Sequence, residues 1–296
     1  MRDKLVQLIH NSLLSDSKSV LLTADLGYSV FDVFEEFRDS QYFNVGVSEQ
    51  LMASMSCGLA LEGMKVFCYS IGVFPTLRCL EQIRNDVTYH ENDVTFISSG
   101  AGFSYGALGM SHHCVQDIGF VSSIPGITIC TPANEFELDL AYPLLNGPCY
   151  LRIDKSICDH QPEDISLGID IIKYASSSSV SAPKVSVLFH GSIGSIAFQC
   201  IDNNSFDLYS VPCLKRSVGL DKVICDSDYI ITIEEHSICN GFASFISSLI
   251  IQLNSKVKLL PIALPHEHSS VVGTQSYLRE HYDLTSNHLQ SLLNLL

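Results

Sequence analysis

Short apolar runs alternate with longer amphipathic segments through the first half of the chain. The runs have the length of buried strands, and the segments between them have the length of helices. Strands are predicted at Ser19–Thr23, Lys65–Tyr69, Val94–Ser98, Ile127–Cys130 and Cys149–Ile153, and helices at Glu49–Leu61, Leu77–Tyr89 and Glu135–Leu145. Strands separated by helices predict a mainly parallel sheet with helices on both faces.

A polar and serine-rich stretch then interrupts this alternation. Asp159–Asp164 is polar and contains proline, and Ala175–Pro183 is rich in serine. Beyond it the pattern restarts, with strands predicted at Val185–Phe189, Tyr229–Ile233 and Val257–Leu260, a helix at Asn240–Leu253 and two closing helices. We therefore predict an α/β fold of two domains, residues 1–158 and a smaller one at 184–296, joined by a linker at 159–183.

The charge of the chain limits the partners that it can bind. It has 32 Asp plus Glu but only 17 Lys plus Arg, which gives a net charge of −15. This balance argues against a nucleic acid or an anionic membrane surface as a partner. A phosphate group would have to be bound by a few local cations.

Two further patterns indicate the cellular setting. No apolar run reaches the length of about 18 residues that predicts a membrane span, and the N-terminus lacks the apolar core of a signal peptide. The 11 cysteines are scattered, and no two of them form C-x-x-C. We therefore expect reduced core cysteines in a cytoplasmic protein, with a zinc site or a thiol catalyst as the alternative.

A glutamate at the start of an apolar helix gives the strongest local signal. Asn44–Gln50 reads NVGVSEQ, so Glu49 follows a glycine turn and opens a predicted helix. A carboxyl group at that position lies at the positive end of the helix dipole. Taken alone, the glutamate would be explained by that interaction, but the surrounding motifs change the interpretation.

Several short motifs occur in an order and spacing that resemble the second half of transketolases. They are Ala24–Gly27, Asn44–Gln50, Ser111–His113, Gly147–Pro148, Tyr150–Arg152, and Glu234–His236 followed by Gly241. More narrowly, essentially the whole chain resembles the separately encoded C-terminal subunit of split transketolases. The resemblance implies a mainly parallel-sheet pyrimidine-binding domain followed by a transketolase C-terminal domain.

The resemblance also implies a cofactor and a partner chain. In that family thiamine diphosphate lies between two domains, one of which binds the diphosphate and Mg²⁺ through a Gly-Asp-Gly stretch, and this chain has no such stretch. The magnesium and diphosphate ligands are therefore expected on an N-terminal-type partner subunit, without which this chain is inactive. A homodimer of this chain would join two partners in a heterotetramer. The implied reaction transfers a two-carbon ketol unit from a ketose or ketose phosphate to an aldehyde.

The cofactor contacts that the resemblance implies involve four residues. Glu49 would hydrogen-bond the pyrimidine ring and help to activate the cofactor. Phe74 would stack on that ring, with Tyr69 as the second candidate, and Asp25 would lie in the same site. A core phenylalanine at a strand end is the alternative for Phe74. The following helix carries groups that suit either a subunit interface or a solvated face, namely Arg78, Glu81, Gln82 and Arg84.

The substrate contacts follow from the same resemblance. His112 would contact the donor sugar and transfer protons, although a loop histidine that caps the next helix is the alternative. The role of His113 stays open. Arg2, Ser29 and Lys155 would bind the substrate phosphate.

Two departures from the family put the usual pentose phosphates in doubt. Gly100 stands where the family has a phosphate-binding histidine, and Leu108 stands where it has the aspartate that recognises the substrate 2-hydroxyl. A buried polar contact of this kind is worth about 1–3 kcal/mol. We therefore expect a ketose donor with an unusual acceptor, in specialised sugar or surface-polysaccharide synthesis.

Two rival functions stay open. A subunit resembling deoxyxylulose-phosphate synthase or the E1β chain of oxo-acid dehydrogenases would use the same cofactor on pyruvate or another 2-oxo acid. A non-catalytic binding subunit could have kept the fold alone. For His236 we expect a structural or inter-subunit role, and we expect no metal at His266 and His268.

Overall fold

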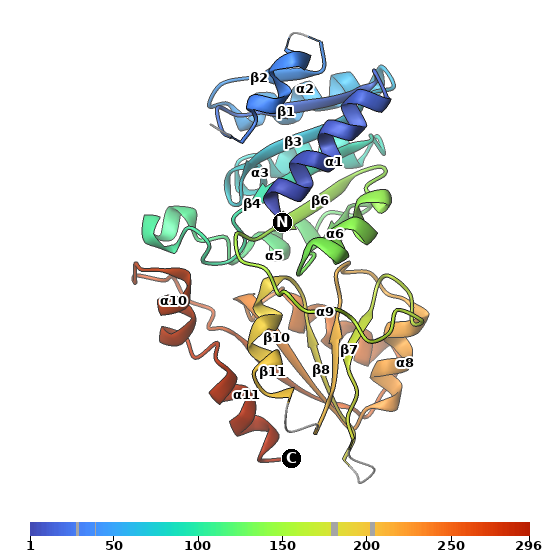
Figure 1. The fold of residues 1–296 in the computed structure, drawn as a ribbon, viewed down its shortest axis with the longest axis vertical. Helices are drawn as coiled ribbons and strands as arrows, with labels where there is room; N and C mark the ends of the chain where they lie inside the picture. Colours follow the sequence, from blue (N-terminus) through green and yellow to red (C-terminus); the bar gives the residue numbers. More distant parts are fainter. Residues whose placement is uncertain (28–29, 39, 179–182, 202–204) are drawn as a thin grey trace.

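The computed structural model describes residues 1–27, 30–38, 40–178, 183–201 and 205–296. Ser29, which was expected to bind the substrate phosphate, lies outside these residues. The described chain forms two sheets, one above the other in Figure 1, and each is covered by helices. The α/β fold with two domains that the sequence predicts is confirmed.

The first sheet has six strands in the order β2-β1-β3-β4-β6-β5, and every neighbouring pair is parallel. The strands are β1 Ser19–Thr23, β2 Tyr42–Asn44, β3 Lys65–Ile71, β4 Val94–Ser99, β5 Thr128–Cys130 and β6 Cys149–Ile153. The helices of this half are α1 Arg2–Ser15, α2 Glu49–Leu61, α3 Phe74–Leu77, α4 Leu80–Gln82, α5 Asp117–Ser122 and α6 Glu135–Ala141. The sequence pattern missed β2, which is too short to show alternation.

Helices cover both faces of this sheet, as predicted. On β3, Phe67 and Tyr69 pack with Leu5 and Ile9 of α1. The alternate strand residues, such as Cys68, pack on the other face in one cluster with apolar residues of α2. The carboxyl ends of the parallel strands therefore meet at one edge, with a different helix layer on each side.

The predicted helix at Leu77–Tyr89 is wrong in its bounds. The structure begins helical turns earlier, at α3, and breaks them into α4 and a π-helical turn at Ile83–Thr88. Pro75 lies in the first turn of α3, where the missing N–H of proline costs nothing. This early start places Phe74 and Arg78 one helical turn apart.

The second sheet has five strands in the order β11-β10-β8-β9-β7. The strands are β7 Ile172–Ala175, β8 Val185–Phe189, β9 Asp207–Ser210, β10 Tyr229–Ser237 and β11 Lys258–Leu264, and the helices are α7 Ser195–Phe198, α8 Val218–Asp226, α9 Phe242–Gln252, α10 Gln275–His281 and α11 Ser286–Leu293. All neighbours are parallel except β7 and β9, which are antiparallel. This half therefore forms a mixed sheet.

Strand β7 lies inside the segment that we expected to be a linker. Ile172 and Tyr174 are buried in the core of the second domain, and β7 closes the edge of its sheet. This apolar run is short and is followed directly by the serine-rich stretch, so the sequence pattern did not predict a strand there. Strand β10 is also longer than predicted and includes Glu234–His236, so His236 lies within a strand and not after one.

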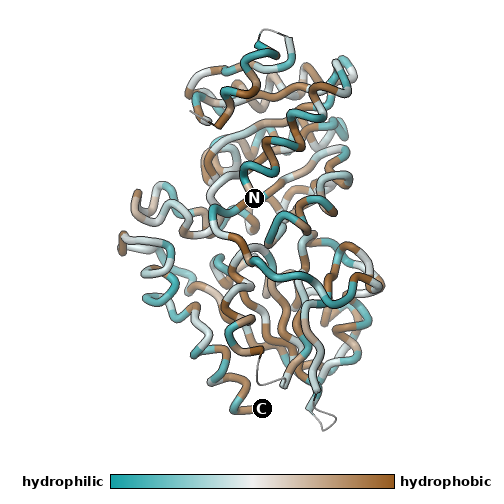
Figure 2. Tube along the Cα trace, in the orientation of Figure 1, coloured by the Kyte–Doolittle hydropathy of each residue, from teal (hydrophilic) through white to brown (hydrophobic). Residues whose placement is uncertain are grey.

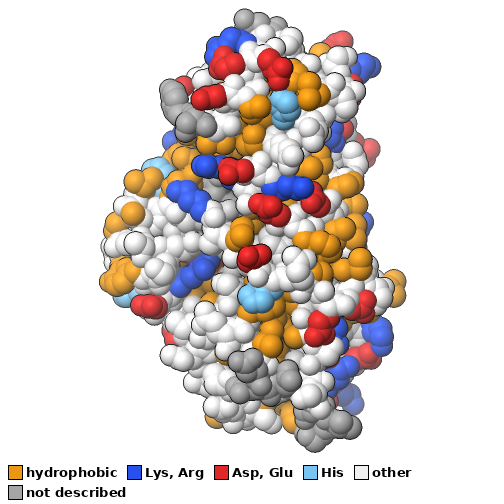
Figure 3. All heavy atoms as spheres, viewed as in Figure 1, with side chains coloured by type: hydrophobic (Ala, Val, Ile, Leu, Met, Phe, Trp, Pro, Cys, Tyr) orange, Lys and Arg blue, Asp and Glu red, His pale blue; other side chains and the backbone are white. Residues whose placement is uncertain are grey.

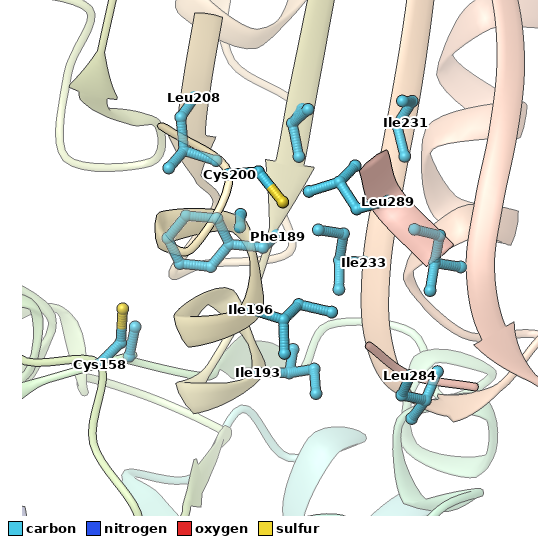
Figure 4. Close-up of a cluster of buried hydrophobic side chains, with 14 of the residues drawn as sticks. Cys158, Phe189, Ile193, Ile196, Cys200, Leu208, Ile231, Ile233, Leu284 and Leu289 are labelled. Carbon is cyan, nitrogen blue, oxygen red and sulfur yellow. The ribbon is translucent and has the colours of Figure 1, made fainter. Parts of the chain in front are cut away.

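One apolar cluster joins the two domains. It contains Phe103 and Cys158 from the first half of the chain together with Phe189 and Ile233 of the second sheet. Figure 4 shows Cys158 to the left of the other side chains of this cluster, and Figure 2 shows the apolar residues running along the strands of the second sheet. The domains therefore share buried surface.

The surface and the helices carry two further observations. On the face shown in Figure 3, acidic and basic side chains lie interspersed and no broad basic field is visible. Among the described residues, no helix combines the length and apolar character needed to cross a bilayer.

Candidate functional site

Glu49 is a buried carboxyl group with one charged partner. It opens α2, and only 4% of its side chain is exposed. Arg78 donates from Nη1 to Glu49 Oε2 at 2.8 Å. Within the described part of the chain, the other carboxylate oxygen makes no hydrogen bond with the protein. Glu49 can therefore still hydrogen-bond a ligand through Oε1.

Arg78 links Glu49 to two aromatic groups. Its guanidinium lies 4.3 Å from the centroid of the Phe74 ring. Phe74 in turn meets the ring of His112 edge to face, with centroids 5.3 Å apart and planes at 73°. The structure thus brings three sequence-predicted site residues, Glu49, Phe74 and His112, into one continuous set of contacts through Arg78.

We refer to Glu49, Phe74, Arg78 and His112 as the site quartet. The sequence analysis left Arg78 as either an interface or a solvent-facing residue. The 74–78 spacing was the signal for its contact with Phe74, because residues four apart in a helix share a face. Its contact with Glu49 spans 29 positions and had no local signal.

The two adjacent histidines have opposite environments. His112 lies at a short 3₁₀ turn, Met110–His112, and its Nδ1 is 3.0 Å from Ser111 Oγ. His113 is only 2% exposed, and its Nε2 is hydrogen-bonded to the Gly106 carbonyl at 3.2 Å. Burial lowers the pKa of His113. His112 is therefore the histidine that faces the site, and His113 supports the loop.

Asp25 and Asn44 join the ends of two neighbouring strands. The Asp25 N–H donates to Asn44 Oδ1 at 2.9 Å, and Asn44 Nδ2 donates to Asp25 Oδ1 at 3.2 Å. The Gly46 N–H donates to the same Asn44 Oδ1 at 3.0 Å. Asp25 has a φ of 56°, a left-handed conformation that this bonding compensates. Asn44, which the sequence analysis did not single out, therefore fixes the turn that precedes Glu49.

Tyr69 does not join the site quartet. Its ring packs edge to face against Phe31, with centroids 4.6 Å apart, in the core beneath α1. Burial raises the pKa of Tyr69. The side chain therefore belongs to the face of the sheet opposite to α2.

Arg2 and Lys155 lie close enough for their positive charges to interact. Arg2 begins α1 and is about half exposed, and Lys155 follows β6 with Nζ 3.6 Å from the centroid of the Tyr105 ring. Burial, and next the positive charge of Arg2, lower the pKa of Lys155. The positive charge of Arg2 also opposes, weakly, the rise that burial causes in the pKa of Tyr69. Two cations thus gather at the side of the sheet where Tyr69 lies.

The backbone and the packing at position 100 both require glycine. Gly100 has a φ of 93°, and a Cβ there would overlap the Tyr105 ring. A histidine at this position would therefore require Tyr105 to move. Leu108 is 56% exposed and brings no polar group. The conformation of this loop therefore suits glycine at position 100, and Leu108 supplies no polar contact.

A second buried polar cluster lies where the domains meet. Arg152 donates from Nε to Asp117 Oδ2 at 2.7 Å, and Tyr150 donates to the same oxygen at 2.7 Å. His236 of the second domain lies with Nε2 4.0 Å from Asp117 Oδ1. Its ring is fully buried, and burial lowers its pKa. This position suits the structural role expected for His236.

The residues present suit the pyrimidine end of thiamine diphosphate. A buried carboxyl with one oxygen left to bond can pair with a ring nitrogen, and the partly buried Phe74 ring offers a face for stacking. Among the described residues, no three His, Cys, Asp or Glu side chains are arranged to hold a metal ion. The eleven cysteines are free thiols, most of them buried.

Comparison with known proteins agrees with these observations. The family described as "Transketolase, pyrimidine binding domain" matches residues 1–159. One of the subunits of the apulose-4-phosphate transketolase of Actinobacillus succinogenes is 25% identical over 276 residues, which are 87% of this chain and 85% of that protein. The 1-deoxy-D-xylulose-5-phosphate synthase of Chlorobium luteolum is 27% identical over 263 residues, 84% of this chain but 41% of that protein.

A solved structure shares the fold over its full length. A split-gene transketolase, described as an inactive beta4 tetramer, superposes with a TM-score of 0.80 at 19% identity and covers 99% of this chain and 96% of that one. The fold, the matched domain and the relatives lead to one conclusion. The chain belongs to the transketolase family and contains its pyrimidine-binding domain.

Proposed function

We propose that this chain is one subunit of a heteromeric, thiamine-diphosphate-dependent enzyme of the transketolase type. The enzyme transfers a two-carbon ketol unit from a ketose or ketose phosphate to an aldehyde acceptor. The observation that carries this proposal is the site quartet, in which Glu49, Phe74 and His112 come together from three separate segments.

A partner chain completes the proposed enzyme. This chain has no Gly-Asp-Gly stretch, and the relative in A. succinogenes is itself named as a single subunit of its transketolase. The partner would supply the diphosphate and Mg²⁺ ligands, in an assembly of two copies of each chain. Free thiols suit a reducing compartment, so we place this enzyme in the cytoplasm.

The residues of this chain have distinct roles in the proposal. When bound, thiamine diphosphate supplies the electron sink that allows the carbon–carbon bond beside a ketose carbonyl to break and re-form. Glu49 holds a proton between its carboxyl group and the pyrimidine ring, and Phe74 fixes the plane of that ring. Asp25 and Asn44 keep the turn before Glu49 in place.

Substrate contacts come from the other named residues. His112 hydrogen-bonds the hydroxyl groups of the sugar and transfers protons at them. Arg2 and Lys155, whose charges act on each other, bind the substrate phosphate. Because Gly100 and Leu108 supply none of the usual contacts, we propose an acceptor outside the common pentose phosphates, used in specialised sugar or polysaccharide synthesis.

A second candidate function rests on one comparison. The deoxyxylulose-phosphate synthase relative is about as similar to this chain as the transketolase relative is. An enzyme of that kind would use the same cofactor on pyruvate. The two functions differ in the donor, so the donor decides between them.

The test is a reconstitution of activity. This chain is co-purified with a candidate partner that carries a Gly-Asp-Gly stretch, and is supplied with thiamine diphosphate and Mg²⁺. Ketose phosphates, apulose 4-phosphate among them, are offered as donors, as are unphosphorylated ketoses and pyruvate. Each donor is combined with a panel of aldehyde acceptors. Ketol transfer that needs both chains and is lost in Glu49→Gln supports the proposal, whereas Glu81→Gln, an exposed residue outside the site quartet, should retain activity.

Two results would contradict the proposal. Turnover with pyruvate as the only donor that the enzyme accepts would establish the second candidate in its place. Full transfer activity in Glu49→Gln would show that the carboxyl group has no part in the reaction.

A further inference from the structure

The loop that carries His112 is held by the second domain. The Phe103 N–H donates to Glu235 Oε1 of β10 at 3.0 Å. The Phe103 ring also stacks on Tyr282, just beyond α10, with centroids 5.6 Å apart and planes at 13°. Phe103 is fully buried by these contacts. Phe103, near the start of the loop that carries His112, is thus bound to elements that lie far away in the sequence.

Two glycines allow the second domain to approach this loop closely. The Gly273 N–H donates to the Gly106 carbonyl at 3.4 Å. A Cβ at Gly106 would come within 2.5 Å of Leu278 Cδ1, and a Cβ at Gly102 within 2.5 Å of Glu235 Cδ. Only glycine fits these points without displacing a neighbour. The loop is therefore shaped to fit β10 and α10.

Arg279 of α10 fixes Glu235 in the position that Phe103 requires. It donates to Glu235 Oε2 from Nη2 at 2.5 Å and from Nε at 3.1 Å, so both bonds hold one carboxylate oxygen while Oε1 accepts from the Phe103 N–H. Arg279 is 13% exposed, and Glu235 is 3% exposed. Burial raises the pKa of Glu235, and the charge of Arg279 opposes that shift.

The same arginine also faces a carboxylate of the first domain. Arg279 Nη2 lies 3.5 Å from Asp154 Oδ2, and Gln275 Nε2 donates to both Asp154 and Glu235 at 3.1 Å. Asp154 also accepts a hydrogen bond from Ser104, the residue after Phe103. Without Arg279, two buried carboxylates would face each other with no cation between them, and their repulsion would push the loop away.

The anchored segment leads directly to His112. The Gly106 carbonyl is hydrogen-bonded to His113 at 3.2 Å, and the Phe103 ring meets the His113 ring edge to face at 5.0 Å. The His113 ring is thus held by two contacts, one with Gly106 and one with Phe103. The next residue back along the chain, His112, reaches Phe74.

We infer that Arg279 and Glu235 are positioning residues that hold His112 in the site quartet. Together with Asp154 these two residues form a contact between the domains that we call the latch. The second domain acts on the reaction through the latch. The inference rests on the proposed function for its catalytic consequence. Its structural part, the anchoring of residues 100–113, stands without that function.

The structural part is tested on the full chain by hydrogen exchange. In Arg279→Gln, amides at 101–113 should exchange roughly tenfold faster or more, while amides of β3 and β4 keep their rates. The matched control is Arg216→Gln, which removes an exposed ion pair with Asp221 in the same domain. Unchanged exchange at 101–113, or an equal rise along the whole chain, would overturn the latch.

The catalytic part is tested on the assembled enzyme. Arg279→Gln should lower kcat roughly 10- to 100-fold with little change in thiamine diphosphate affinity, and Arg279→Lys should restore part of the loss. In a His112→Asn background, Arg279→Gln should lower kcat by less than about twofold. An equal loss in both backgrounds would overturn the positioning role. If the unmodified enzyme transfers no ketol group, the proposed function fails, and hydrogen exchange alone decides the latch.

Discussion

Arg78 donates a 2.8 Å hydrogen bond to Glu49, joining a half-exposed guanidinium to a carboxyl group that is 4% exposed. The helix dipole alone would have accounted for a glutamate at the first turn of α2. The arginine adds a specific partner on the solvent side and leaves the other oxygen for a ligand. Glu49 is thus a buried carboxyl group with one oxygen left for a ligand, and not only a helix-start residue.

Removal of Arg78 should cost little stability. Because its side chain is 49% exposed, we expect Arg78→Met to lower the free energy of unfolding by only about 1 kcal/mol. Urea denaturation of the single variants and of Arg78→Met combined with Glu49→Gln measures the coupling. Arg84→Met, which removes an exposed hydrogen bond to Asn85, should change stability by less than ~0.5 kcal/mol. A coupling far above 1 kcal/mol would show that the pair is more deeply buried in solution.

Phe74 and Tyr69 should differ in their effect on the cofactor. Phe74→Leu removes the ring that can stack and should weaken thiamine diphosphate binding to the complex roughly 3- to 10-fold. Tyr69→Phe keeps the ring packed against Phe31 and should leave the affinity within about twofold. Calorimetric titration of the complex measures both. Unchanged affinity in Phe74→Leu would contradict the stacking role of Phe74.

The two adjacent histidines should separate activity from stability. His112→Ala should abolish most ketol transfer and change stability by less than ~1 kcal/mol. His113→Ala removes a buried ring bonded to Gly106 and packed on Phe103, and should cost about 2 kcal/mol. Thermal unfolding and initial rates on the same preparations provide the comparison. Equal stability losses in both variants would contradict the opposite environments of these side chains.

Arg2 and Lys155 should govern the preference for phosphorylated donors. Arg2→Gln or Lys155→Gln should raise KM for ketose phosphates about 10-fold and leave unphosphorylated ketoses unaffected. The effect should shrink at high ionic strength, because the two cations act through charge. Lys4→Gln, on the same helix but paired with Asp139, is the control. Identical KM changes for both kinds of donor would remove these residues from phosphate binding.

Acid should destabilise the chain partly through His190. The ring is buried and its Nδ1 is bonded to Thr131 Oγ1 at 2.8 Å. Burial, reinforced by the charges of Arg152 and His236, lowers the pKa of His190 well below its ordinary value of 6.5. Below about pH 6.5 the unfolded chain therefore binds a proton that the folded chain refuses, and stability falls by up to about 1.4 kcal/mol per pH unit.

The variant His190→Gln isolates this effect. Glutamine can still bond Thr131 but does not titrate, so the stability of the variant should fall less steeply between pH 6.5 and 5. The difference between wild type and variant is the relevant quantity, because burial raises the pKa of Glu234 to about 7 and gives a slope of opposite sign. Urea denaturation at several pH values measures it. Parallel stability curves would show that His190 is protonated in the folded chain.

The sequence was most informative where the signal is local. The apolar alternation located Ser19–Thr23 and Cys149–Ile153 to the residue, because a buried strand needs a continuous apolar run. It failed at β2, β7 and β9, whose short runs are strands only because neighbouring strands supply their hydrogen bonds. It also missed the break after α3, since a π-helical turn leaves no simple periodic mark.

The sequence by itself determined the fold class, the family and the kinds of side chain in the site, because apolar period and motif order are properties of neighbouring positions. Only the tertiary structure decided which of these side chains meet. Glu49 meets Arg78 across 29 positions and Phe103 meets Glu235 across 132, while Tyr69 is turned to the opposite face of its sheet. Such pairings depend on strand order and on domain packing, which no local pattern encodes.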